Sequence, residues 1–385
     1  MNTQQARYDE LLSYGPLISQ AGTVYVLGYQ EARQILGDHK RFVKDALNTV
    51  PATQRPPRSS QGGDMLSMIY DNMLGTDAPD HTRLRALVSR SFTARQIQTL
   101  APRIQQIVDG LIDGFEHKQE VELIEAYAFP LPIIVICELL GAPIEDRDKF
   151  RVWSHAFLGI ASDQLAYIQS LQEFVSYIGQ MIAERRKSPK DDLISRLVHA
   201  EENGQQLSEQ ELYSMIALLI VAGHETTVNL IGNGMYALLQ DRDQLEKLKA
   251  NPDLVDRAIE EFLRFDGPVE MATTRYAAED VQIGDTLIRR GSAVVVILGA
   301  TGRDVTVFDE PAKLDISRES NHHLGFSYGV HYCVGAPLAR LEARIAFTTL
   351  LKRIPNIRLA VSPASIYYNE SAIVRGVAEL PVEWG

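Results

Sequence analysis

The 385-residue chain is 45% hydrophobic and 23% charged, which is the composition of a folded globular protein. Its 38 basic and 50 acidic residues leave a net charge of −12, which argues against nucleic acid as a partner. The sequence shows neither an apolar run of the roughly 18 residues that a bilayer requires nor a secretory signal, so we expect a cytoplasmic protein with no membrane contact. Two cysteines, Cys137 and Cys333, are too few for a disulfide framework.

Short strand-like stretches are separated by long helical ones. The first strand is expected at 23–27, in the sequence TVYVL. From Asp80 onward, apolar residues recur at helical spacing in two successive helices. Their apolar faces comprise Leu84, Leu87, Val88 and Phe92, followed by Ile104, Ile107, Val108, Leu111, Ile112 and Phe115. Helices therefore dominate the first two thirds of the chain.

The longest helix is expected to begin at Ser208, because Ser208 and Glu211 have the spacing of a capping box. Its apolar pattern runs to about Leu239, a length of roughly 45 Å at 1.5 Å per residue. Strand-like stretches return at 274–298 and in the C-terminal tail. The sequence therefore predicts a mainly α fold with a small β part formed by about 23–27, 274–298 and the tail, and composition alone does not settle the number of domains.

Cys333 lies in the stretch that is richest in chemistry, FSYGVHYCVG at residues 326–335, directly before a helical run. A cysteine near a helix N-terminus experiences the helix dipole, which favours the thiolate form. A thiolate is a nucleophile or a metal ligand. Gly335 permits a close approach of the backbone to whatever the sulfur holds, and Phe326 can shield it from water. The alternative is a buried structural cysteine.

The pattern Phe326-x-x-Gly329-x-His331-x-Cys333-x-Gly335 resembles the haem-ligand loop of the cytochrome P450 family, the haem-thiolate monooxygenases. The resemblance covers nearly the whole chain and is to the soluble bacterial type. It implies one haem domain, residues 1–385, with the P450 fold and the long central helix over the haem. It also implies Cys333 as the iron ligand of haem b. Two residues depart from the family pattern, because Ser327 stands where glycine is usual and Gly302 where asparagine is common.

A second motif, AGHETT at residues 222–227, lies inside the long helix. Glycine and paired threonines are poor choices for helix stability alone. By resemblance Ala222 and Gly223 contact the haem at a local helix distortion, and Glu225 with Thr226 guides protons to dioxygen as the catalytic pair. The alternative is a solvated glutamate beside a threonine that bonds to the carbonyl four residues earlier.

Two further sets match family elements. Glu261 and Arg264, three residues apart in a helix, would ordinarily form a surface ion pair. By resemblance they join Arg318 in a buried structural triad that supports the cysteine loop. The second set consists of cations that by resemblance bind the haem propionates. These are His81, Arg85, Arg275 and His331.

A mainly apolar substrate pocket is expected beside the haem. Its candidate residues are Met65, Leu66 and Ile69 in an early loop, Leu218 and Leu219 on the long helix, Val269 and Met271 before Arg275, and Ile373 near the tail. Each of them could equally belong to the ordinary core. Cys137, within an apolar run, is most simply a core residue.

The resemblance implies hydroxylation or epoxidation of an apolar small molecule with O2 as co-substrate. We favour a natural product such as a polyketide or macrolide, possibly bound to a carrier protein. Electrons must come from outside, from NAD(P)H through a reductase and a ferredoxin or flavodoxin, because the chain has no flavin or iron–sulfur motif left over. A basic patch of Arg90, Arg95, Arg340 and Arg344 is expected to receive this partner.

Other functions stay open. Within the family, the substrate could be a fatty acyl chain, a terpenoid or a steroid, and the enzyme could be a peroxide-driven peroxygenase. A non-catalytic haem sensor would carry the same ligand loop. A protein of another class could bind zinc through His322, His323, His331 and Cys333, although their spacing matches no recognised zinc motif.

Overall fold

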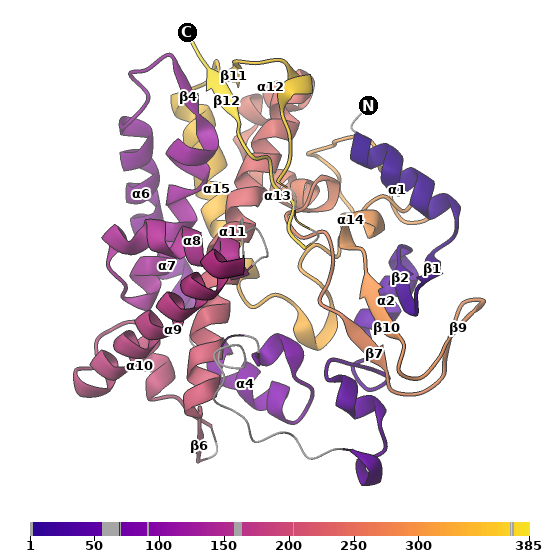
Figure 1. Cartoon of the computed structure of the whole chain (residues 1–385). Coiled ribbons are helices and arrows are strands. Elements are labelled where there is room, and N and C mark those ends of the chain that lie inside the picture. Colours follow the sequence, from indigo (N-terminus) through magenta and orange to yellow (C-terminus); the bar gives the residue numbers. More distant parts are fainter. Residues whose placement is uncertain are drawn as a thin grey trace.

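The structure is a computed structural model that describes residues 3–55, 69, 71–90, 92–157, 164–202, 204–369, 371 and 373–385. Helices gather on one side of the molecule and a small sheet lies on the other, as Figure 1 shows. The helices are α1 (Thr3–Ser13), α2 (Tyr29–Gly37), α4 (Asp80–Ser89), α5 (Ala94–Thr99), α6 (Ala101–Asp113), α7 (Pro130–Leu140), α8 (Arg147–Phe157), α9 (Gln164–Lys187), α10 (Leu193–Val198), α11 (Glu209–Gln240), α12 (Arg242–Ala250), α13 (Val255–Phe265), α14 (Leu298–Thr301) and α15 (Ala336–Arg353). The predicted mainly α fold with a small β part is confirmed.

The long helix α11 begins where the capping box predicts. The Ser208 hydroxyl accepts from the Glu211 amide, and the Glu211 carboxylate accepts from the Ser208 amide, so both halves of the box are present. By length and composition α11 could span a membrane, but 83% of its most apolar window is buried inside the protein. It is therefore a core helix.

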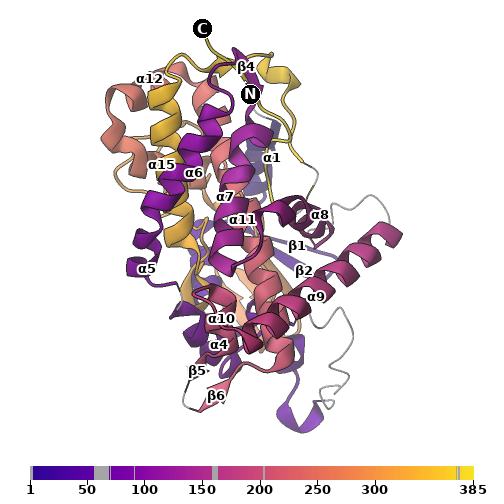
Figure 2. The same ribbon diagram turned by 90° about the vertical axis from the view of Figure 1, so that its left-hand side faces the viewer.

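Helices α7, α13 and α15 pack on α11, and α6 packs on α7 and α15. Figure 2 shows α6, α7 and α15 beside α11. Gly234 on α11 shows why they come so close. A Cβ placed on it would lie 2.7 Å from the rings of Phe262 on α13 and Phe347 on α15. Only glycine leaves room for both aromatic rings, which lie 5.0 Å apart between their centroids.

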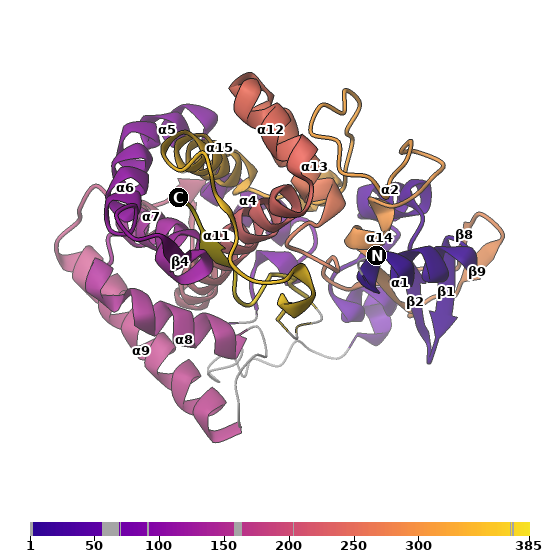
Figure 3. The ribbon, with the colours of Figure 1, turned by 90° about the horizontal axis from the view of Figure 1, so that it is seen from above.

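The main sheet has five strands in the order β1 (Leu17–Gln20), β2 (Thr23–Val26), β10 (Ala293–Val296), β7 (Arg275–Ala277) and β3 (Phe42–Val43). Strand β10 is parallel to β2, with Val294 opposite Val24 and Val296 opposite Val26. These four valines are buried. Figure 3 shows this part, with α1, on the side of α11 away from α6. A separate hairpin joins β8 (Val281–Ile283) to β9 (Thr286–Ile288).

The tail differs from the grouping that the sequence suggests. Its strand β12 (Pro381–Glu383) pairs with β11 (Arg358–Leu359) and β4 (Glu120–Glu122) in a second sheet. Leu380 and Val382 are fully buried in the helical core, and this burial draws the strand away from the first sheet. Earlier in the tail, Val374 forms an antiparallel β-bridge with Val269, which packs against the core of the first sheet.

Candidate active site

The cysteine loop is shaped by two backbone turns in front of α15. A short 3-10 turn (Gly329–His331) brings the chain round, and the Cys333 amide donates to the Phe326 carbonyl at 3.0 Å. Gly329 has φ 76°, and a Cβ there would lie 2.7 Å from the Leu36 carbonyl oxygen, so glycine is required. The loop is held against α2 at this point.

The departure at Ser327 has a backbone explanation. Ser327 has φ 64°, in the left-handed region that glycine occupies at little cost. Its amide still donates to the Leu324 carbonyl at 2.7 Å, so the turn closes with serine as well. Glycine is therefore the easier residue at this position, and serine carries conformational strain without opening the loop.

The Cys333 side chain is only partly exposed. Burial raises the pKa of its thiol, while the backbone amides of Gly335 and Ala336 and the charge of Arg85 act to lower it. The helix terminus therefore favours the thiolate as the sequence suggests, but without a bound cation burial outweighs it. A metal ion would reverse this balance, because coordination deprotonates a thiol outright.

Histidine and arginine side chains from three segments, namely α4, the 329–331 turn and β7, meet beside this loop. The imidazoles of His81 on α4 and His331 lie 4.2 Å apart between ring centroids. Arg85, one turn after His81, and Arg275 on β7 both act electrostatically on His331. Burial, followed by these neighbours, lowers the pKa of His331 to about 2. The structure thus brings together all four residues that the resemblance assigns to the propionates.

Lys44 is a fifth member that sequence reasoning missed. Its ammonium donates to the Thr273 carbonyl at 2.8 Å and to the Thr274 carbonyl at 2.6 Å, directly before Arg275. Burial and the charge of Arg275 lower the pKa of Lys44 to about 6. No local signal marks this lysine in the sequence, because its position depends on the pairing of β3 with β7.

This cluster fits a dianion such as the two propionates of haem. Asp77 acts on several of the cations, and its carboxylate is already engaged by the Lys44 and Asp45 amides at 2.8 and 3.0 Å. Among the described residues, His81 Nε2 and His331 Nδ1 are buried without a hydrogen-bond partner. Buried polar atoms are rarely left unpaired in proteins. The arrangement therefore has the charge and the free donors that an anionic group requires.

One facet of α11 is open although the rest of the helix is buried. Ala222 is exposed and Gly223 and Thr226 are partly exposed, while their neighbours from Leu212 to Leu239 are nearly all buried. Residues four apart share a helix face, so Ala222 and Thr226 form one small open surface. A flat group could lie against this surface, which consists of small side chains.

The arrangement of Glu225 and Thr226 matches neither the expected helix distortion nor the alternative of a solvated glutamate completely. Helix α11 is continuous from Glu209 to Gln240, without the expected distortion, and the Thr226 hydroxyl donates to the Ala222 carbonyl at 2.9 Å. Glu225, however, is not solvated, because only 5% of its surface is exposed. Burial raises the pKa of its carboxyl to about 7. An acid of that pKa can both hold and release a proton near neutral pH.

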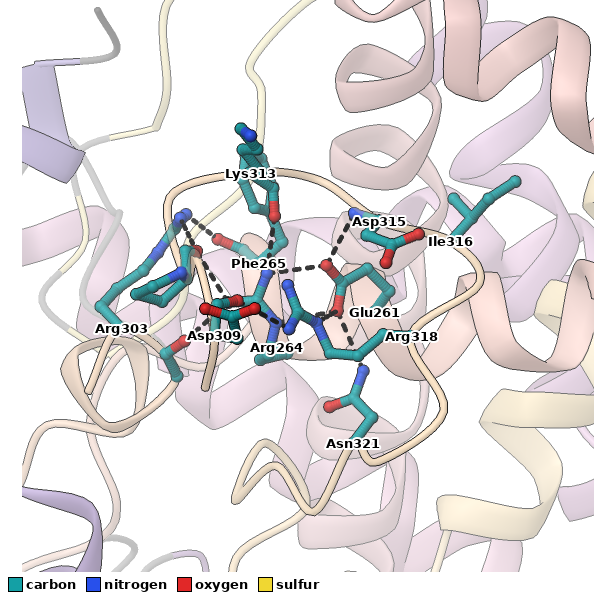
Figure 4. Close-up of polar contacts among 12 residues, drawn as sticks. Glu261, Arg264, Phe265, Arg303, Asp309, Lys313, Asp315, Ile316, Arg318 and Asn321 are labelled. Carbon is teal, nitrogen blue, oxygen red and sulfur yellow. Dashed lines mark hydrogen bonds and ion pairs between the residues drawn. The ribbon is translucent and has the colours of Figure 1, made fainter. Parts of the chain in front are cut away.

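The buried triad is present as predicted. Figure 4 shows Arg264 and Arg318 converging on the Glu261 carboxylate, with Arg264 Nε and Nη2 donating at 2.8 and 2.7 Å and Arg318 Nε at 3.1 Å. The side chains of Glu261 and Arg264 are fully buried. Arg264 Nη1 also donates to the Gly302 carbonyl at 2.7 Å. A Cβ on Gly302 would clash with the Arg264 carbonyl, so this glycine permits the close contact.

The predicted substrate residues are divided among separate packing clusters. Met65 and Leu66 lie outside the described residues. Ile69, Leu218 and Leu219 belong to the main helical core. Val269 packs with the β-sheet core, and Met271 packs with Tyr8 and Ile297 and lines a cleft of about 1300 Å³ beside α1. Ile373 is 50% exposed. The common pocket stays a prediction.

The positions of the histidines and cysteines bear on two further expectations, the alternative zinc site and the core position of Cys137. Among the described residues, no three His, Cys, Asp or Glu side chains come together as a metal site, so nothing supports the zinc alternative. His323 instead contacts Glu260 at 2.9 Å. Cys137 is buried in α7, and burial raises the pKa of its thiol to about 12, which agrees with a core residue.

Comparison with known proteins identifies the family. The cytochrome P450 family model matches residues 150–355. The chain is 44% identical over 357 residues to the polyketide biosynthesis cytochrome P450 PksS of Bacillus subtilis (strain 168), covering 92% of this chain and 87% of that protein. It is 45% identical over 364 residues to the cytochrome P450 monooxygenase PikC of Streptomyces venezuelae, covering 93% and 84%.

Solved structures agree with this result. The structure of PksS from the Bacillus subtilis 168 bacillaene polyketide synthase superposes with a TM-score of 0.90 at 40% identity, covering 99% of this chain and 97% of that one. P450BioI, in complex with an acyl carrier protein ligated to hexadec-9Z-enoic acid, gives a TM-score of 0.89 at 37% identity, covering 99% and 98%. The chain therefore belongs to the cytochrome P450 family. It is a haem-dependent monooxygenase that uses O2 and electrons from a redox partner.

Proposed function

We propose that this protein hydroxylates or epoxidises an apolar polyketide or macrolide, and that the Cys333 thiolate would hold the iron of haem b. The observation that carries the proposal is the buried cation cluster beside Cys333, where His81 and His331 each keep a ring nitrogen without a partner among the described residues. A propionate-bearing group supplies the missing acceptors. Similarity to PksS and PikC supports the substrate class.

Bound haem supplies the activation of dioxygen. The residues of the chain would bind the haem, leave space for O2 and substrate, and supply protons. His81, Arg85, Arg275 and His331 would hold the propionates by charge-assisted hydrogen bonds. Thr226 and Ala222 would present a small surface on α11, which leaves space for O2 and one edge of the substrate. Glu225, with its carboxyl pKa raised to about 7, would store and release the protons that the reduction of dioxygen consumes.

The ligand assignment is tested by exchanging each cysteine for serine. The reduced, carbon-monoxide-treated protein should show the red-displaced Soret band of thiolate ligation. Cys333→Ser should lose this band, whereas Cys137→Ser, whose sulfur is buried in α7, should keep it. Loss of the band in both variants, or in neither, would contradict the role of Cys333.

The substrate class is tested by a visible-spectrum titration. Macrolactones, terpenoids, steroids, free fatty acids and acyl-carrier-protein-bound fatty acids are compared for the spin-state shift that follows expulsion of water from the iron. The proposal expects the strongest shift with macrolactones. A response only to acyl carriers would favour the acyl alternative, which the similarity to P450BioI makes specific. Turnover with hydrogen peroxide alone would indicate a peroxygenase, and haem binding without turnover a sensor.

Redox partner binding is expected on the cysteine side of the molecule, in the cytoplasm. Arg340 and Arg344 of the predicted basic patch have carboxylate partners. Arg340 donates to Glu260 at 2.6 and 2.8 Å, and Arg344 donates to Asp256 at 2.6 Å. The basic patch predicts that an acidic ferredoxin binds there and that its binding weakens with salt. Because these two arginines are paired, the weakening should be small. The rates of reduction by an acidic ferredoxin and a flavodoxin, at low and high ionic strength and with Arg344→Glu, test this expectation.

A further inference from the structure

Glu225 has two histidine neighbours, and both approach the same carboxyl oxygen. His155 Nε2, from α8, lies 4.0 Å from Glu225 Oε2, and His224 Nε2, from the preceding position of α11, lies 3.7 Å from it. The His155 side chain is 41% exposed, whereas that of His224 is fully buried. One neighbour therefore reaches water and the other does not.

His224 cannot supply protons to Glu225. Its Nδ1 lies 2.8 Å from the Ile220 carbonyl, which accepts, so Nδ1 carries the ring proton. Nε2 is then an acceptor, and among the described residues it has no hydrogen-bond partner. Burial lowers the pKa of His224 to about 4, so the ring stays neutral near pH 7. His224 can accept a contact from protonated Glu225, but it has no proton to donate.

His155 differs from His224 in its exposure and not in the direction of its pKa, which burial and then the charge of Arg151 also lower. It lies on the α8 surface that packs on α11, and its partly exposed ring can exchange protons with water. The charged groups around it are Arg151 on its own helix, Glu125 in the π-helical turn η4 (Ile124–Ala128), and Glu225 on α11. Arg151 is fixed by two hydrogen bonds to Glu125, at 2.8 Å each, and lies over the Phe129 ring. The setting of His155 is thus rigid on one side and open to solvent on the other.

We propose that His155 is the port through which protons enter from solvent and reach Glu225. The inference rests on the proposed function, in which Glu225 supplies protons at the active site. The His155 imidazolium transfers its Nε2 proton to the Glu225 carboxylate, giving a neutral imidazole and a carboxylic acid. Hydronium or a buffer acid in the bulk solvent then protonates the imidazole again, leaving water or the buffer base. The distance of 4.0 Å exceeds a hydrogen bond, so the ring turns toward Glu225 or one water lies between them. His155 is a positioning and relay residue, because it acts through Glu225.

The test measures proton delivery in the haem-loaded enzyme. A plant-type ferredoxin, its reductase and NADPH supply electrons, and the macrolactone with the largest spin-state shift serves as the probe. The ferredoxin is raised until the rate of O2 consumption no longer depends on it. The rate is then compared in H2O and D2O for wild type, His155→Gln, and the exposed control His117→Gln. Glutamine keeps a hydrogen-bonding side chain but cannot relay a proton as imidazole does.

We expect His155→Gln to slow O2 consumption by about tenfold, since water replaces a relay group only in part. The solvent isotope effect should rise, while the carbon-monoxide band and the behaviour of His117→Gln stay as in wild type. A slower rate with an unchanged isotope effect would assign His155 a structural role and overturn the proposal. So would loss of haem binding in both His155→Gln and His155→Asn. Failure of the proposed function itself would appear in the wild type, as an absent thiolate band.

Discussion

The imidazoles of His81 and His331 lie 4.2 Å apart, and each keeps a buried ring nitrogen that has no partner among the described residues. The two histidines come from segments far apart in the sequence, so the fold has to assemble this pair. Two neutral, desolvated rings beside the charged guanidinium groups of Arg85 and Arg275 make a site that stabilises an anion and contributes little to the protein without one.

We therefore expect His81→Phe and His331→Phe to lose haem faster without weakening the fold. A hydrogen bond to a charged group contributes about 1.5 to 3 kcal/mol, so loss of haem should accelerate about tenfold or more. Transfer of haem to excess apomyoglobin, followed at the Soret band, measures the rate. His117→Phe, at an exposed position, is the control. Unchanged transfer in both variants would refute the propionate assignment.

Buried and exposed ion pairs of this chain should differ sharply in their effect on stability. Glu261 accepts five hydrogen bonds, from Arg264 twice, Arg318, Asn321 and the Asp315 amide. Glu261→Gln removes the charge that Arg264 requires, and we expect a loss of about 3 to 5 kcal/mol together with loss of haem. Soluble yield, haem content and the urea midpoint measure it.

The matched comparison is Arg344→Ala, which breaks the exposed pair with Asp256. Exposed pairs are weak, so the free energy of unfolding should change by no more than about 0.5 kcal/mol. Similar losses in Glu261→Gln and Arg344→Ala would show that the buried triad does not hold the cysteine loop as proposed.

The strain at Ser327 predicts a stabilising substitution. Because its φ is 64°, Ser327→Gly relieves a left-handed conformation, and we expect a gain of up to about 1 kcal/mol in the free energy of unfolding. The thiolate band should not change, because the hydrogen bond from the Cys333 amide to the Phe326 carbonyl does not involve the Ser327 side chain. Ser292→Gly, outside the left-handed region, should instead lose stability. A Ser327→Gly protein that is less stable than wild type would contradict this account.

The sequence predicts the features that depend only on residues close together in the chain. The capping box at Ser208 gave the start of α11, and the spacing around Cys333 gave the loop, because both depend on neighbouring residues. The roles of Lys44 and His155 could not be predicted in this way. Lys44 reaches the site only because β3 pairs with β7, and His155 only because α8 packs on α11. The strand pattern of the tail does not specify its partner, so the prediction that the tail joins the first sheet is wrong for β12, which pairs with β11 and β4.

Glu342 on α15 provides a pH dependence that is separate from the active site. It is 1% exposed, its Oε2 has no hydrogen-bond partner among the described residues, and burial raises its carboxyl pKa from the ordinary 4.5 to about 8. Between these two values the folded protein binds more protons than the unfolded chain. The free energy of unfolding must therefore fall as the pH rises through this window, by ~1.4 kcal/mol per pH unit for one carboxyl group.

Glu342→Gln removes this titration while keeping the shape of the side chain. We expect the variant to be more stable than wild type by an amount that grows between about pH 5 and about pH 8, in line with the linkage slope. Thermal midpoints of the haem-loaded proteins across this range measure the difference. Glu225, whose pKa is raised to about 7, titrates in both proteins and cancels in the comparison. Parallel pH profiles would mean that the Glu342 carboxyl group has a partner that stabilises its charge in the folded protein.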